Sequence, residues 1–109
     1  MPSLNRGDLI WIARYDPQGK ELADRHPAVV ISPTEYNVKQ KMAIICQIKT
    51  RLSRNLFEVP IPEGNGIDGV VIIDSLITID TDARSYSLAG KLPSKTMTEV
   101  LQRIRTLLT

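Results

Sequence analysis

The sequence predicts a mainly β domain, a compact and partly closed barrel of five to seven short strands followed by one C-terminal α-helix. Short runs rich in β-branched residues recur along the chain and are separated by turn-forming residues. Near the end, apolar residues recur at the spacing of one helix face, as in Met97, Val100, Leu101, Ile104 and Leu108. At 109 residues, the whole range 1–109 is expected to form a single domain.

The first half of the chain is predicted to hold three strands, at Leu9–Ala13, Ala28–Ile31 and Met42–Ile48. The second run is continuous and β-branched, which is typical of a strand buried on both faces. Pro27 is expected to open that strand, because proline has no N–H for a ladder. Residues 20–24 are interpreted as a polar loop, and Thr34–Asn37 as one helical turn.

The second half is predicted to add strands at Leu56–Ile61, Gly69–Ile73 and Leu76–Ile79, with a last small strand within Ser85–Lys91. Pro60 places the first of these at a sheet edge. The terminal helix is expected to be capped by Ser94, or by a capping box of Thr96 and Glu99. Trp11 and Phe57 are predicted to lie in the core rather than to stack on bases.

Composition is that of a globular protein with a net charge of +2, and no apolar run approaches the roughly 20 residues of a membrane span. Cys46 lies in an apolar run and is expected in the core. Because it is the single cysteine of the sequence, no internal disulfide is possible, which is in keeping with a reducing cytoplasm. With one histidine and one cysteine, no metal or other cofactor is expected.

No acidic residue lies between Glu35 and Glu58, a stretch that holds Lys39, Lys41, Lys49, Arg51 and Arg54. This basic segment suits phosphates, although it is equally a solvated loop balanced by acids elsewhere.

Polar side chains gather at three strand ends, namely Glu21, Arg25 and His26, then Lys49, Thr50 and Arg51, then Asp74 and Ser75. If these ends share one rim, cations, hydroxyls and an imidazole suit RNA cleavage, because the 2′-hydroxyl is a built-in nucleophile. Histidine as a residue type suits proton transfer near neutral pH, which makes His26 the candidate proton carrier, and Arg25 is the better phosphate anchor.

Several segments together resemble the MazF/PemK toxins: Arg6-Gly7-Asp8-Leu9-Ile10-Trp11, Asp16-Pro17, Gly19-Lys20-Glu21, His26-Pro27-Ala28-Val29-Val30-Ile31-Ser32-Pro33, Tyr36-Asn37, Thr78-Ile79-Asp80 and Ala83-Arg84. The resemblance implies a cytoplasmic homodimer with an SH3-like, PemK/CcdB-like barrel. It implies metal-independent, sequence-specific cleavage of single-stranded mRNA through 2′-OH attack, and an antitoxin whose acidic segment fills the RNA groove. Together with the strand-end and basic residues above, the catalytic candidates are Glu21, Arg25, His26, Thr50 and Asp74. The candidates for RNA binding are Lys20, Tyr36, Lys49, Arg51, Arg54 and Arg84.

Two positions depart from the family pattern. The family arginine before the second-strand proline is His26 here, with Arg25 one residue earlier, and the family threonine after the third strand falls on Lys49, with Thr50 one residue later. A one-residue offset on a strand turns a side chain to the opposite face. Either the adjoining loops absorb both offsets, or His26 and Lys49 have taken over the roles of the family arginine and threonine, or the enzyme is weakened.

Other interpretations stay open at this point. His26 is also read as a loop histidine, Asp74 as a turn cap, and Thr50 as a strand-end residue; Tyr15 and Tyr36 are weak candidates for base stacking. A CcdB-like toxin that poisons DNA gyrase has the same expected fold. A non-catalytic, RNA-binding relative would explain the two displaced positions.

Overall fold

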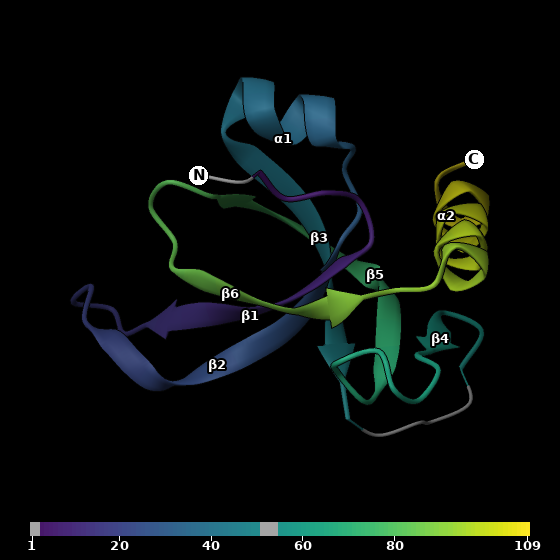
Figure 1. The fold of residues 1–109 in the computed structure, drawn as a ribbon, viewed down its shortest axis with the longest axis horizontal. Helices are drawn as coiled ribbons and strands as arrows, with labels where there is room; N and C mark the ends of the chain where they lie inside the picture. The colour runs from purple at the N-terminus through teal and green to yellow at the C-terminus, as the bar shows by residue number, and fades with distance from the viewer. Residues whose placement is uncertain (1–2, 51–54) are drawn as a thin grey trace.

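The fold is a six-stranded antiparallel sheet with two helices, in a computed structural model that describes residues 3–50 and 55–109 (Figure 1). The elements are β1 (Asp8–Tyr15), β2 (Glu21–Val30), α1 (Thr34–Gln40), β3 (Met42–Lys49), β4 (Glu58–Pro60), β5 (Val70–Asp80), β6 (Tyr86–Lys91) and α2 (Ser94–Leu108). Strands follow one another in the order β4-β5-β3-β2-β1-β6. The predicted mainly β fold with a C-terminal helix is confirmed. Among the described helices, none has the length and apolar character to cross a membrane.

Apolar side chains cover both sides of the curved sheet, because successive residues of a strand point to opposite faces. We call one side the α2 face, since helix α2 packs on it; its core includes Leu9, Val29, Cys46, Ile48, Val71, Ile73, Met97 and Val100. We call the other side the Ile12 face; its core includes Leu4, Ile10, Ile12, Ala28, Val30, Ile45 and Ile79. The central strands are therefore buried on both faces, as their continuous apolar runs predict.

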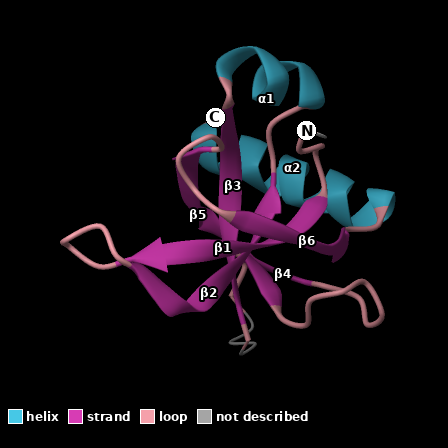
Figure 2. Cartoon of the chain, turned by 60° about the vertical axis from the view of Figure 1, so that its left-hand side comes forward, coloured by secondary structure: helices cyan, strands magenta, loops and turns pink. Residues whose placement is uncertain are grey.

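Strands β1 and β2 extend past the sheet as a two-stranded arm (Figures 1 and 2). Their ladder runs from Leu9↔Val29 to Tyr15↔Glu21, whereas β2 pairs with β3 only over Ala28–Val30. The polar loop predicted for residues 20–24 is thus wrong beyond Lys20, because the arm takes these residues into β2. Pro27 lies inside β2 instead of opening it; it sits where β3 no longer pairs with β2, so its missing N–H costs no ladder bond there.

Strand β5 replaces two predicted strands. It pairs with β3 at Cys46↔Leu76 and at Ile48↔Val71, so the intervening residues of β5 form a bulge. A bulge adds unpaired residues to one strand and bends it without ending it. Asp74, which was expected to separate two strands, lies within this bulge.

The connection between β4 and β5 packs closely against β6 and closes that side of the molecule. A Cβ on Gly90 would lie 1.9 Å from the backbone oxygen of Asn65, and one on Gly66, whose φ is 107°, would lie 2.1 Å from that of Ala89. Only glycine allows this approach without backbone movement. The contact curls the sheet toward a partly closed barrel, with β4 and β6 as the edges of the described sheet.

Several local predictions were wrong. Trp11 and Phe57 are 36% and 38% exposed instead of lying in the core. Helix α2 begins after Pro93 with no side-chain cap, and Glu99 pairs with Arg103 one turn later instead of forming a capping box. Proline at this position has no N–H of its own to satisfy and fixes φ for helix entry.

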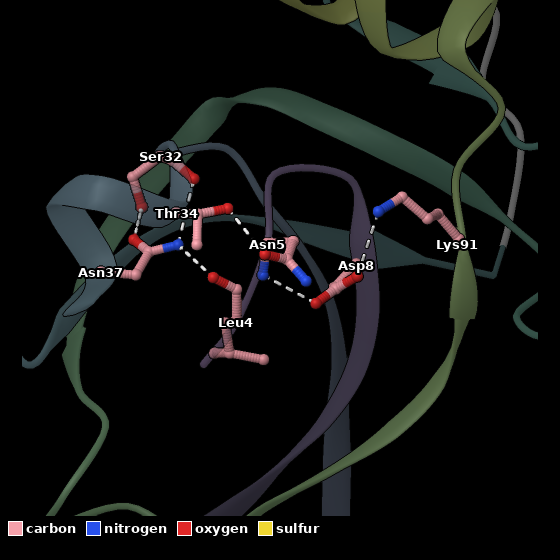
Figure 3. A network of polar contacts seen from close by, with 7 residues as sticks. All are labelled: Leu4, Asn5, Asp8, Ser32, Thr34, Asn37 and Lys91. Carbon is pink, nitrogen blue, oxygen red and sulfur yellow. Dashed lines mark hydrogen bonds and ion pairs between the residues drawn. The ribbon is translucent and has the colours of Figure 1, made fainter. Parts of the chain in front are cut away.

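A buried polar network fastens the N-terminal segment to helix α1 and strand β6 (Figure 3). The Asn37 amide donates to the carbonyl oxygens of Leu4 at 2.8 Å and Ser32 at 3.1 Å, and its oxygen accepts from the Ser32 hydroxyl at 2.5 Å. Asp8 faces Lys91 at 3.7 Å. These bonds hold Leu4 against the core of the Ile12 face.

Candidate active site

Arg25 and His26 lie on opposite faces of β2. Pairing between β1 and β2 is continuous from Leu9↔Val29 through Ile12↔His26 to Ala13↔Arg25. Directly paired residues point to the same side, so His26 shares the Ile12 face and Arg25 the α2 face. Because this pairing is continuous, no loop compensates for the one-residue offset between Arg25 and His26. The two side chains therefore point to opposite faces of the sheet.

On the α2 face, Arg25 is held against the start of β6. Its Nη2 donates to the Ser85 hydroxyl at 3.2 Å, while the Ser85 carbonyl accepts from the Ala13 N–H at 2.9 Å. The Tyr15 hydroxyl accepts from the Ser85 N–H at 3.5 Å. Arg25 therefore belongs to a contact between the arm and β6.

On the Ile12 face, the sheet brings His26 and Lys49 to one region. Ala28 pairs with Gln47 of β3, and Lys49 lies two residues further, on the same side as Gln47. His26 lies two residues before Ala28 and past the last β2–β3 pair, so His26 and Lys49 share a side of the sheet without forming a ladder pair. His26 is exposed and Lys49 is half-buried, so an imidazole and an ammonium face solvent together. Thr50 is an exposed residue in the bend that follows β3.

Lys49 forms an ion pair with Glu58 at the start of β4. The Glu58 side chain is only 4% exposed, against 38% for Lys49. A buried carboxylate without a cation would be costly, so the pair satisfies Glu58 while it fixes the direction of the lysine. Arg51 and Arg54, also predicted to bind RNA, lie outside the described residues.

Asp74 is exposed in the β5 bulge, directly after Ile73 of the α2-face core. Burial, together with the charge of Asp74, raises the pKa of the Cys46 thiol to about 12. Cys46 is therefore a protonated core side chain at neutral pH, as its apolar run predicts.

The predicted residues on the arm are set apart from this region. Glu21 pairs with Tyr15 near the tip, and Lys20 is exposed in the turn that Asp16 holds by accepting from the Lys20 N–H at 2.8 Å. Further along, Arg14 donates to Asp24 at 2.6 Å, and this hydrogen bond lowers the pKa of the Asp24 carboxyl. The structure does not bring Glu21 and Lys20 to the strand position of His26.

Tyr36 and Arg84 occupy two further places. Tyr36 lies on α1, which precedes the start of β3, whereas Lys49 is the last residue of β3. Arg84 lines a hollow of about 510 Å³ together with Tyr15, Ser85 and Tyr86. Tyr86 pairs with Ile12, and Ile12 pairs with His26, so this hollow borders the face that carries the histidine.

Glu58 is the residue that sequence reasoning missed. It stood out only as the acid that ends the basic segment, and nothing in the linear sequence connects it with Lys49. Strand β5 lies between β3 and β4 in the sheet, so the proximity of Lys49 and Glu58 follows from strand order and register. Within the described ranges, no group of three or more His, Cys, Asp and Glu side chains has a metal-binding arrangement.

Comparison with known proteins extends over almost the whole chain. Residues 5–108 match the family described as PemK-like, MazF-like toxin of type II toxin-antitoxin system. The chain is 34% identical over 103 residues to the Endoribonuclease toxin MazF of Escherichia coli K12, covering 94% of this chain and 91% of that protein. It is 30% identical over 111 residues to Endoribonuclease PemK of Escherichia coli, covering 97% and 83%.

Solved structures show the same fold. A crystal structure of MazF from Deinococcus radiodurans has a TM-score of 0.84 and 30% identity, covering 99% of this chain and 98% of that one. A MazE-MazF crystal structure from the same organism has a TM-score of 0.85 and 27% identity, with coverage of 99% and 98%.

Proposed function

The chain belongs to the PemK-like, MazF-like toxin family, and from this premise we propose that it cleaves RNA on the Ile12 face of its sheet. It is an endoribonuclease toxin of a type II toxin–antitoxin system, as are the relatives that match most of its length. This supports the main interpretation over the gyrase-poisoning alternative. The observation that carries our choice of face is the shared direction of His26 and Lys49.

In the proposed reaction, His26 moves the proton and Lys49 stabilises charge. The neutral imidazole accepts the proton of the 2′-hydroxyl while the 2′-oxygen attacks phosphorus, and the resulting imidazolium returns a proton to the 5′-oxygen as the P–O5′ bond breaks. The products are a 2′,3′-cyclic phosphate and a 5′-hydroxyl. The Lys49 ammonium lies where negative charge builds up on the non-bridging oxygens. Since RNA supplies the nucleophile, the reaction needs no metal.

We assign Arg25 a structural contact rather than contact with the scissile phosphate. It points to the α2 face and donates to Ser85, so it joins the arm to β6. Thr50 lies in the bend beyond the end of β3. Of the three explanations for the displaced family residues, this favours replacement of the family pair by His26 and Lys49. Asp74, exposed in the β5 bulge, is proposed to contact the substrate beside them.

The substrate proposed is single-stranded RNA, cleaved at particular sequences. Arg84 and Tyr15 border the Ile12 face and offer a cation and a ring to a flanking nucleotide. Lys20 and Glu21 would contact the RNA only if the RNA continued along the arm formed by β1 and β2. We do not expect Tyr36 to share this site, because it lies at the other end of β3.

The chain's partner as a type II toxin is an antitoxin, and solved neighbours include MazE-MazF complexes. We propose that an acidic antitoxin segment covers the cations of the Ile12 face and so competes with RNA. We also propose a homodimer, because Val38, Leu88 and Leu108 are apolar yet 54%, 60% and 70% exposed. We also infer a cytoplasmic location, because the proposed substrate is mRNA.

The direct test is incubation of the purified chain with a long single-stranded RNA in the presence of EDTA. We expect discrete fragments that carry 2′,3′-cyclic phosphate ends and 5′-hydroxyl ends. Addition of the cognate antitoxin should suppress them. Binding of the RNA without any cleavage would contradict the proposal and favour a non-catalytic relative.

A further inference from the structure

Glu58 is a buried charged residue that has no role in the proposed reaction. It is a charged residue whose whole surface is only 6% exposed, at the start of the edge strand β4. Removing a carboxylate from water is unfavourable unless a cation and hydrogen bonds compensate. An apolar residue would fill the same place without this requirement. The carboxylate therefore needs an explanation beyond packing.

Geometry connects Glu58 with the proposed site across one intervening strand. Glu58 pairs with Ile72 of β5, and Lys49 pairs with Val70 of the same strand, two residues away. Residues two apart on a strand share a face, so the two side chains reach toward each other over β5 on the same side of the sheet. Their ion pair is the result.

The two ends of this pair differ in exposure. At 4% exposure the carboxylate is enclosed, and it also accepts from the Asn55 N–H at 3.5 Å, whereas the lysine side chain stays 38% exposed. The buried partner is thus the fixed one, and the ammonium is the end that solvent or a phosphate can reach. A lysine has a flexible four-carbon stem, which loses rotamer freedom when the ammonium is held in one place.

We propose that Glu58 is a positioning residue, which holds the Lys49 ammonium toward the position of the reacting phosphate. This inference rests on the proposed function, in which Lys49 stabilises the charge that develops on phosphorus-bound oxygens. By fixing the stem in the free protein, Glu58 removes that ordering cost from the reaction step. Glu58 does not touch RNA itself; it acts through Lys49.

The first test is Glu58→Gln, which keeps the shape and one acceptor oxygen but removes the charge. Single-turnover cleavage at saturating RNA should slow by about tenfold or more, with little change in the RNA concentration for half-maximal rate. Glu99→Gln is the matched control, since it breaks an exposed pair with Arg103 on α2, and it should cleave at the parental rate. Parental cleavage by folded Glu58→Gln would overturn the inference.

A double-mutant comparison tests whether Glu58 acts through Lys49. In a Lys49→Met background, Glu58→Gln should cause no further loss of rate, because the positioned group is already absent. An equal loss in both backgrounds would show that Glu58 acts by another route. Glu58→Asp retains the charge and serves if Glu58→Gln does not fold; its shorter reach should also slow cleavage.

An RNA-free measurement separates this inference from the proposed function. NMR relaxation of the Lys49 ε-methylene should show an ordered side chain in the parent and a mobile one in Glu58→Gln. If that methylene is equally mobile in both proteins, Glu58 does not position Lys49, whatever the activity. If it is ordered only in the parent and yet the parent cleaves no RNA, the proposed function fails while the pairing stands.

Discussion

Replacement of His26 and of Arg25 by alanine tests the assignment of faces. The two residues are neighbours in sequence, but β2 directs one to each side of the sheet. His26→Ala removes the proposed proton carrier, a loss of roughly 10²- to 10⁴-fold in cleavage rate. This corresponds to about 3 to 5.5 kcal/mol of transition-state stabilisation. Arg25→Ala removes a hydrogen bond to Ser85, which contributes about 1 kcal/mol or less to folding, so cleavage should stay within about threefold of the parent.

The assay is single-turnover cleavage of a labelled RNA with EDTA present, followed across pH from about 5 to 8. His26→Arg should lose the pH dependence that the imidazole causes. Arg105→Ala, on the exposed side of α2, controls for the loss of one positive charge. The reasoning is refuted if Arg25→Ala loses a hundredfold while His26→Ala cleaves like the parent, because the reacting phosphate would then lie on the α2 face.

Three further changes test the surroundings of the site. Asn37→Ala leaves the Leu4 carbonyl and part of the Ser32 bonding without partners in a buried network, so chemical denaturation should show a loss of about 3 kcal/mol; a loss below about 1 kcal/mol would contradict that role. Gly90→Ala forces the loop between β4 and β5 off β6, and calorimetry should show a lower Tm, with about 2 kcal/mol of stability lost; an unchanged Tm would mean that the loop moves freely. Arg84→Ala should weaken RNA binding similarly for all sequences and reduce the salt slope by about one, measured by fluorescence anisotropy; an unchanged slope would remove Arg84 from the RNA contact.

The sequence by itself predicted those features that depend on the side-chain pattern within a single segment. The continuous apolar run Ala28–Ile31 predicted a strand buried on both faces, and the periodic apolar residues after Pro93 predicted helix α2. The apolar setting of Cys46 likewise predicted an unreactive core thiol. These features depend on side-chain pattern within one segment, which the sequence displays directly.

Tertiary structure decided what depends on pairing between distant segments. Residues 21–24 have charged residues at both ends, Glu21 and Asp24, and were expected in a loop, yet pairing with β1 makes them a strand of the arm. The bulge at Asp74 is visible only through the register between β3 and β5. A side chain's partners across a sheet are set by strand order and register, and neither quantity is a local property of the chain.

The site shows the same division. Sequence identified the residue types suited to RNA chemistry, including both His26 and Arg25, and it showed that a one-residue offset would separate them. Which of the two shares a face with Lys49 followed from the β1–β2 pairing, continuous from Leu9 to Ala13, and from the β2–β3 register. The ion pair with Glu58 followed from the position of β5 between β3 and β4. The sequence therefore shows which side-chain chemistry is available. The direction and the partner of each side chain are fixed only when the sheet forms, because they depend on hydrogen-bonded pairing between strands that are distant in sequence.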